Sequence, residues 1–226
     1  SRYFAYRGYQ VLAPDFPGHG LSGGTPLDSI EAMADWVIAL LDSLDVNAAC
    51  LVGHSQGCLV TIDAAARYPD RVARLGLIAG ALAIPVNDHL LSLSDKALSE
   101  AIQAMISWGH GPMGHMHDNT QPGHSFLGFG NQLMAANNQN ALKNDLIACN
   151  KYKNGKDSAS KIQQPALCIL AEKDKMTPLK FGQQMANTLI RGQVTVIESA
   201  GHMLPAEFPN EVNTALRNFL NETDKS

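Results

Sequence analysis

The stretch Cys50-Leu51-Val52-Gly53-His54-Ser55-Gln56-Gly57 decides the fold of this chain. The apolar run over residues 48–52 predicts a strand buried on both faces of a parallel sheet, and apolar residues recur at helical spacing from Gln56 to Tyr68. Between the two elements, Gly53 and Gly57 predict a tight turn that holds Ser55 at unfavourable backbone angles and leaves no room for a side chain on either side of it.

This order of strand, turn and helix, with a G-x-S-x-G sequence in the turn (residues 53–57), is typical of a nucleophile elbow. It predicts that the Ser55 hydroxyl stands at the carboxyl end of the strand, beside the positive end of a helix. The backbone N–H of Gln56 is then one oxyanion donor. The alternative is that the pentapeptide arose by chance and marks an ordinary loop.

Composition fits a globular protein of one domain with an insertion. The chain has 226 residues, of which 45% are hydrophobic and 17% charged, and its formal net charge is −4. The sequence has no basic run, so we expect no nucleic-acid partner, and it contains no apolar stretch long enough for a membrane span. We expect a cytoplasmic protein. The four cysteines have no C-x-x-C spacing and are expected to be small core residues.

Alternating strands and helices predict an α/β fold with a mostly parallel sheet. The stretch Gly8–Ala13 is expected to form a strand, and Thr25 is expected to cap the helix that follows it. The elbow and a third apolar run over residues 71–80 continue the alternation. The later strands are expected at residues 164–171 and 194–197, with a helix capped by Thr177 and Pro178 between them, and the last helix at about 209–220.

Between the third and fourth of these strands the pattern changes to amphipathic helices without strands. We interpret residues 84–160 as a helical cap or lid at the carboxyl ends of the strands. The first part of the core then spans residues 1–83, and the second part spans residues 161–226.

A serine hydroxyl is a weak nucleophile until a base takes its proton, and that base needs a third group to orient it. Asp174 follows one strand and His202 follows the next, so we expect both at the same end of the sheet as Ser55. Glu172 competes with Asp174 but lies too close to its strand to point the same way. The alternative is that Asp174 is a helix cap and His202 a surface histidine.

The other histidines are expected to have structural roles, to line a pocket or to face solvent. His19 and His54 are expected to support the first loop and the elbow. Four histidines in the insertion lie near Asp118, but their spacing matches no common metal motif. We therefore predict no metal and no cofactor, and expect these histidines to line a pocket or face solvent: His110, His115, His117 and His124.

Four motifs resemble the α/β-hydrolase superfamily, in its group of small esterases, lactonases, dehalogenases and carbon–carbon bond hydrolases. They are a Gly-Tyr stretch ending in Pro17-Gly18-His19-Gly20-x-Ser22, the elbow, an acid turn Asp174-x-x-x-Pro178, and a histidine loop Ala200-Gly201-His202-x-x-x-x-Glu207-x-Pro209. The resemblance implies that Ser55 is the nucleophile, His202 the base and acid, and Asp174 the residue that orients His202.

The family also carries three strands, a His-Gly loop and a helix ahead of the Gly-Tyr stretch, and this sequence has none of them. The resemblance therefore implies an N-terminally truncated member whose second oxyanion donor is not in this chain. It also departs from the family at Ala171, where a glycine is usual.

The expected activity is hydrolysis of a small carboxylic ester, thioester or lactone through an acyl-enzyme on Ser55. Serine at this position argues against haloalkane dehalogenases and epoxide hydrolases, which use aspartate there. The same residues also serve carbon–carbon bond hydrolases and acyltransferases. A ligand receptor that keeps the fold without turnover, or a non-functional remnant, is a further alternative. A small-molecule acyl substrate is the expected partner.

Overall fold

The computed structural model describes residues 1–115 and 125–222. In this part of the chain, a sheet of four parallel strands runs in the order β1-β2-β3-β4. The strands are β1 (Ala49–His54), β2 (Val72–Ile78), β3 (Ala166–Ala171) and β4 (Gly192–Ile197). Each strand is adjacent in space to the next one in sequence, as the alternating pattern of the sequence predicts.

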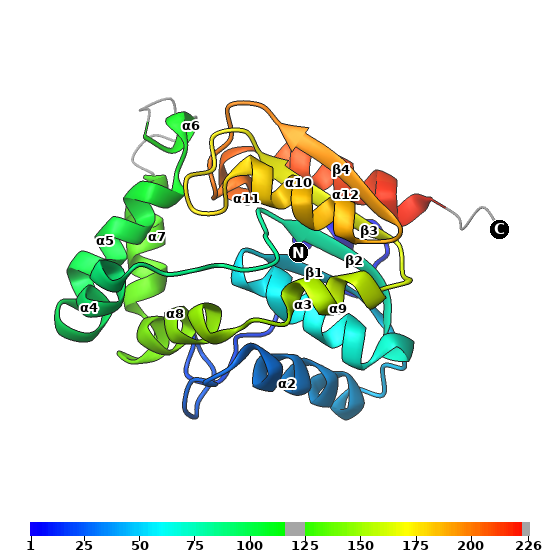
Figure 1. The fold of residues 1–226 in the computed structure, drawn as a ribbon, viewed down its shortest axis with the longest axis horizontal. Helices are drawn as coiled ribbons and strands as arrows, with labels where there is room; N and C mark the ends of the chain where they lie inside the picture. The colour runs from blue at the N-terminus through cyan, green and yellow to red at the C-terminus, as the bar shows by residue number, and fades with distance from the viewer. Residues whose placement is uncertain (116–124, 223–226) are drawn as a thin grey trace.

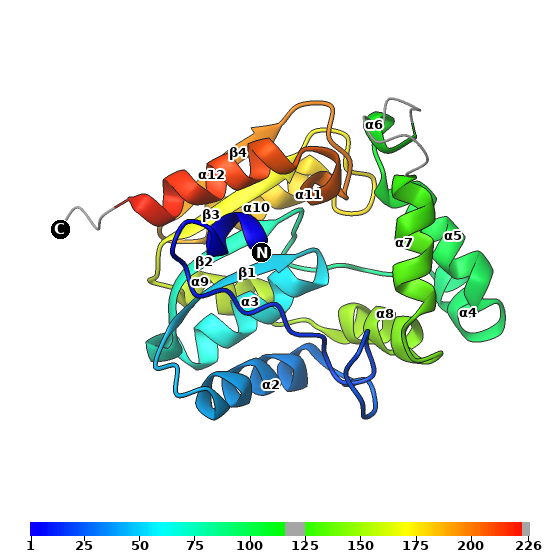
Figure 2. The ribbon, with the colours of Figure 1, turned by 180° about the vertical axis from the view of Figure 1, so that it is seen from behind.

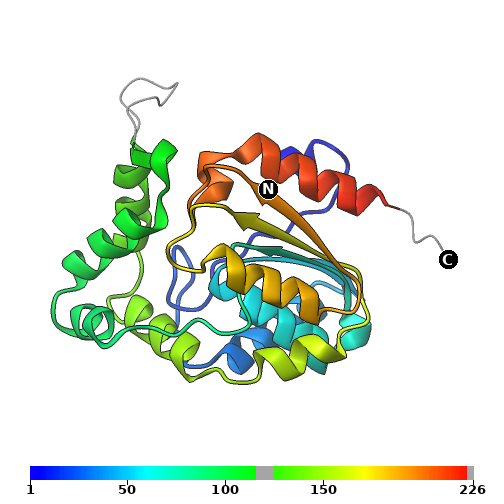
Figure 3. The same ribbon diagram turned by 45° about the horizontal axis from the view of Figure 1, so that its top comes forward.

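Helices cover both faces of the sheet (Figure 3). One face carries α3 (Gln56–Arg67) and α10 (Leu179–Thr188), with α2 (Ile30–Ser43) and α9 (Gly155–Lys161) packed on α3. The other face carries α12 (Pro209–Asn221), with α11 (Leu204–Glu207) before it and α1 (Arg2–Ala5) nearby. A short 3-10 helix, η1 (Pro69–Arg71), leads into β2.

Strand β3 shows how the sheet joins two apolar cores. Every residue of β3 is buried, and successive side chains point to opposite faces of a strand. Cys168 and Leu170 accordingly pack in the core beneath α3 and α10, whereas Leu167 and Ile169 pack against α12. The near-continuous apolar sequence of β3 therefore reflects a central strand that is covered on both sides.

A helical insertion, from α4 (Asp88–Lys96) to α9 (Gly155–Lys161), lies in the chain between β2 and β3. Its first five helices lie on the side of the sheet where the loops after β3 and β4 leave it (Figure 1). Leu90, Ala101 and Leu146 form a small apolar core of their own. The five helices are α4 (Asp88–Lys96), α5 (Leu98–Gly109), α6 (Pro112–His115), α7 (Phe126–Ala135) and α8 (Ala141–Lys151).

The predicted strand at Gly8–Ala13 is wrong. The stretch is a coil that runs from α1 toward the loop beside α8 (Figure 2). A strand requires a neighbour to pair its backbone groups, and among the described residues no strand pairs with this stretch or with the outer side of β1. As a result β1 is an edge strand, Val52 is 50% exposed and Leu12 42% exposed. The insertion consequently follows the second strand of the described sheet, not the third.

Two predicted helix caps are also wrong. Helix α2 begins after Ser29, whose side chain accepts a hydrogen bond from Ala32 N at 3.2 Å, and Thr25 lies outside it. Thr177 does not cap α10; its hydroxyl contacts the Asp174 carboxylate instead.

The prediction that the cysteines are core residues is confirmed at Cys58, Cys149 and Cys168, which are buried, while Cys50 is partly buried. Within the described ranges, no helix has the length and apolar character needed to cross a membrane.

Candidate active site

Ser55 lies in the turn between β1 and α3, where its backbone is strained. Its φ angle is 55° and its ψ angle −117°, a conformation that non-glycine residues rarely adopt and that costs of order 1–3 kcal/mol. The turn is held by a hydrogen bond from Ser55 N to Ile78 O, at 2.9 Å, at the end of the neighbouring strand. The serine is therefore displayed at the carboxyl end of the sheet by its two flanking elements.

The two glycines of the turn have different roles. A Cβ atom on Gly53 would lie 2.1 Å from the carbonyl oxygen of Gly57, so only glycine fits at that position. A Cβ atom on Gly57 would meet no neighbouring group within 4 Å. The sequence argument that both positions lack room for a side chain therefore holds for Gly53 alone.

Gln56 is the first residue of α3, so its backbone N–H has no acceptor within the helix. An N–H in this position, at the positive end of the helix, is suited to hydrogen-bond a developing negative charge beside Ser55. The Gln56 side chain points elsewhere: its Nε2 donates to the carbonyl oxygen of Asp145 in α8, at 3.0 Å. The elbow thereby contacts the helical insertion.

Asp174 and His202 meet at the ends of β3 and β4. His202 Nδ1 donates to Asp174 Oδ2 at 2.8 Å, and the two residues are 3% and 6% exposed. Because their strands are parallel and adjacent, the loops that follow them leave the sheet at one edge. A buried, short bond of this kind fixes the tautomer of the imidazole and leaves Nε2 as its other nitrogen.

Asp174 is held as a carboxylate by its neighbours. Its Oδ1 accepts from the backbone N–H groups of Met176 and Thr177, each at 2.8 Å, and its Oδ2 lies 2.9 Å from the Thr177 hydroxyl. Burial alone would raise the pKa of Asp174. The hydrogen bond and charge of His202, together with the bonds from Thr177, hold that pKa below its ordinary value.

His54 connects the serine turn to the histidine loop. Its Nε2 donates to the backbone carbonyl oxygen of His202 at 2.8 Å, and the two rings lie 4.9 Å apart between centroids. Burial, and then the neighbouring imidazole of His202, lower the pKa of His54 to about 4. The structure thus brings Asp174 and His202 into contact. Ser55 follows His54, which contacts the His202 loop. Among the described residues, no hydrogen bond joins Ser55 Oγ to His202.

Glu172, the competing acid, points away from His202. Its carboxylate accepts from Ser199 N at 2.9 Å and pairs with Lys173 at 3.0 Å in an exposed position. These contacts lower the pKa of Glu172, with the Ser199 bond as the main cause. The geometry therefore favours Asp174 over Glu172 as the partner of the imidazole.

His19 ties the first loop to the insertion. Its Nδ1 donates to Pro17 O at 3.1 Å and its Nε2 to Asp145 Oδ2 at 2.9 Å, so both ring nitrogens carry a proton in this arrangement. The hydrogen bond to Asp145 accordingly raises the pKa of His19. The sequence predicts that His19 supports a loop, but no local pattern indicates that its partner is Asp145 in α8.

The histidines of the insertion form no described metal site. His110 is buried and donates from Nδ1 to Ile106 O at 2.9 Å, and His115 bonds Ser107 O at 3.0 Å. His117, Asp118 and His124 lie outside the described residues. Across residues 1–115 and 125–222, no group of three or more His, Cys, Asp or Glu side chains is placed to hold a metal ion.

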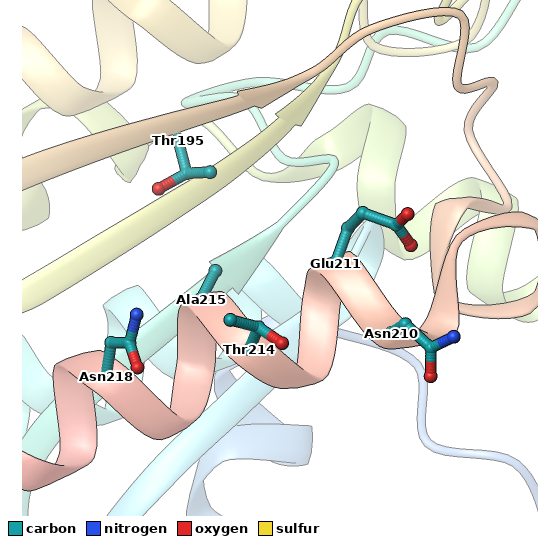
Figure 4. Close-up of a pocket in the computed structure, with 6 residues that line it drawn as sticks. All are labelled: Thr195, Asn210, Glu211, Thr214, Ala215 and Asn218. Carbon is teal, nitrogen blue, oxygen red and sulfur yellow. The ribbon is translucent and has the colours of Figure 1, made fainter.

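A hollow elsewhere on the molecule has a different character. It has a volume of about 400 Å³ and lies between β4 and α12 (Figure 4). Ser55, Asp174 and His202 do not line it, and it contains one carboxylate, from Glu211, among amide and hydroxyl groups. It is therefore separate from the candidate site. Its lining is Thr195, Asn210, Glu211, Thr214, Ala215 and Asn218.

A parallel sheet with a strained serine turn after one strand and an Asp–His pair after two others defines the α/β-hydrolase class. Residues 2–215 match the model of the alpha/beta hydrolase family, and the chain belongs to that family.

Among individual proteins, the chain is similar to Protein ABHD8 of Mus musculus, with 25% identity over 96% of this chain and 50% of that protein. It thus spans about half the length of that relative. It is also similar to (E)-2-((N-methylformamido)methylene)succinate hydrolase of Acinetobacter baylyi, with 26% identity over 95% of this chain and 81% of that enzyme. A solved structure of a thermophilic esterase is 26% identical in sequence and superposes with a TM-score of 0.78. The match covers 91% of this chain and 78% of the esterase chain.

Proposed function

We propose that this protein is a serine hydrolase that cleaves a small carboxylic ester, thioester or lactone through an acyl-enzyme on Ser55. The observation that carries the proposal is the buried 2.8 Å contact between Asp174 and His202 at the strand ends, at the same edge of the sheet as the strained Ser55 turn. The esterase and the hydrolase among its relatives support the same reaction class.

In the first step, Ser55 Oγ attacks the carbonyl carbon of the substrate and His202 Nε2 takes the hydroxyl proton. Asp174 keeps the proton on Nδ1 and stabilises the imidazolium that forms. The negative charge on the former carbonyl oxygen is met by the N–H of Gln56. His202 then gives its proton to the leaving alcohol or thiol, and the acyl group stays on Ser55.

In the second step, water gives a proton to His202 Nε2 and attacks the acyl carbon. His202 then returns that proton to Ser55 Oγ as the bond between Ser55 and the acyl group breaks, which releases the carboxylic acid and restores Ser55. Residues 84–160 are the segment that we propose as the cap. Two contacts support this role: Gln56 of the elbow bonds α8, and the backbone of Met203 beside His202 bonds Gly109 O at 2.9 Å. The cap would then border the acyl group and select among substrates.

The test combines labelling with turnover. A fluorophosphonate probe should label Ser55, and Ser55→Ala, His202→Ala and Asp174→Asn should each lower the turnover of p-nitrophenyl esters by roughly three or more orders of magnitude. Ser43→Ala, at an exposed serine of α2, is the matched control and should change nothing. Labelling at another serine, or near-normal turnover of Ser55→Ala, refutes the proposal. Stoichiometric labelling without ester turnover would favour the ligand receptor.

A further inference from the structure

Glu207 is a buried carboxylate outside the proposed triad. It ends α11, five residues after His202, and is 8% exposed. In the described part of the chain it forms no ion pair, and its Oε1 atom is buried without a hydrogen-bond partner. A buried charge that leaves one acceptor unpaired adds little to stability. Its contacts indicate what it does instead.

The other oxygen of Glu207 joins two segments that are far apart in sequence. Oε2 accepts from Gly111 N at 3.0 Å and from Gly201 N at 3.4 Å. Gly201 is the residue before His202, and Gly111 lies between α5 and α6 of the insertion. One carboxylate oxygen therefore holds the histidine loop and the insertion together.

The two backbones that meet at Glu207 are in direct contact. A Cβ atom on Gly201 would lie 2.0 Å from Gly111 N, and one on Gly111 would lie 2.5 Å from Gly201 N. Two residues after Gly201, Met203 N donates to Gly109 O at 2.9 Å. The insertion is thus joined to the histidine loop on both sides of His202, and a shift of Gly111 is transmitted to Gly201.

We propose that Glu207 is a positioning residue: its carboxylate couples the placement of the insertion to the orientation of His202. The proposal rests on the proposed function, because it assigns His202 the role of base. It requires a side chain long enough to reach both N–H groups, and an oxygen acceptor at its end. Charge matters less, because a neutral amide oxygen accepts the same two bonds.

Three variants separate reach from charge. Glu207→Gln keeps the reach and the acceptor oxygen but removes the charge. Glu207→Asp keeps the charge but withdraws the oxygens by one methylene, and Glu207→Met keeps the length and removes both the charge and the acceptor. Because Glu207→Met leaves no charge in the interior, it tests the loss of the oxygen acceptor in a fold without a buried charge. Glu211→Gln, at an exposed position of α12, is the matched control.

The first readout is amide hydrogen exchange at Gly111 and Gly201, which does not depend on turnover. We expect exchange to accelerate at least tenfold at both amides in the Asp and Met variants and to stay within about threefold of wild type in the Gln variant. The second readout is kcat per fluorophosphonate-labelled site, which corrects for the folded fraction. It should fall by about 10- to 100-fold in the Asp and Met variants, the effect of a small misplacement of a reacting group.

The outcomes are distinguishable from a failure of the proposed function. If Ser55→Ala retains turnover, the proposed function fails, while the exchange result still decides whether Glu207 joins the two segments. If Ser55→Ala is inactive but the Asp and Met variants exchange and turn over like wild type, the positioning role is overturned. Equal losses in the Gln and Met variants would overturn it as well, because the lost charge, and not the lost oxygen acceptor, would then be the cause.

Discussion

His54 should make the protein lose stability in mild acid. The imidazole is neutral in the folded state because burial and the neighbouring His202 lower its pKa from 6.5 to about 4. In the unfolded chain the same group titrates at its ordinary value, so between pH 6.5 and pH 4 the unfolded state binds more protons. Stability contributed by the neutral imidazole is therefore complete above pH 6.5 and declines as the pH falls toward 4.

The size of this loss follows from the two pKa values. Each unit of difference corresponds to about 1.4 kcal/mol once the pH lies below both values. At pH 5 the unfolded imidazole is almost fully protonated and the folded one is mostly neutral. The free energy of unfolding should then be lower than at pH 8 by about 2 kcal/mol from this group alone.

Equilibrium urea unfolding at pH 8, 7, 6 and 5 measures this effect, with His54→Gln as the matched variant. Glutamine does not titrate, and its amide can still donate to the His202 carbonyl oxygen that accepts from His54 at 2.8 Å. Because Asp174 and His19 titrate in both proteins, their contributions cancel in the difference. A difference between the two proteins that changes by less than about 0.5 kcal/mol between pH 8 and pH 5 would contradict the argument.

Two further predictions concern single positions in the fold. Gly53→Ala should strongly destabilise the fold because its Cβ would lie 2.1 Å from Gly57 O, whereas Gly57→Ala should fold with normal or slightly higher stability because its Cβ faces open space. Thermal unfolding compares the two variants, and equal destabilisation would contradict the predicted difference. Tyr152→Phe removes the 3.1 Å hydrogen bond to buried Asp63 and should lower the free energy of unfolding by about 1–3 kcal/mol in the same urea assay. Tyr9→Phe removes an exposed hydrogen bond to Asn221 and should change the free energy of unfolding by less than about 0.5 kcal/mol.

The elements that local pattern determines were predictable from sequence. Strand β3 is apolar along its whole length and helix α12 has apolar residues on one face, and the structure has both within two residues of the predicted bounds. The predicted strand at Gly8–Ala13 has the same kind of apolar sequence, yet it forms no strand, because pairing depends on a neighbour that the local sequence does not specify. Residues 126–135 form helix α7 although Gly128 and Gly130 lower the helix propensity of this stretch.

Some residues of the candidate site can likewise be predicted from the sequence, and others cannot. Ser55, Asp174 and His202 stand in recognisable turns after strands, so their types and order in the chain were enough to select them. The sequence pattern predicts only a helix cap at Thr177 and a motif position at Glu207, because their partners in the structure are backbone groups of distant residues. Such contacts leave no local signal, since any residue supplies a carbonyl or an N–H. Only the three-dimensional arrangement identifies them.

The position of the insertion has a consequence for the order in which the chain assembles during synthesis. The segment that connects β1 to its partner β2 is short, and so is the segment that connects β3 to β4. Leu75 of β2, in contrast, pairs with Ala166 of β3 only after the whole insertion has been synthesised. At a synthesis rate of about 5–20 residues per second, the edge of β2 stays unpaired for on the order of ten seconds. During that interval a nascent chain on the ribosome presents an apolar, open strand edge, which is a binding site for chaperones and for other unfinished copies of itself.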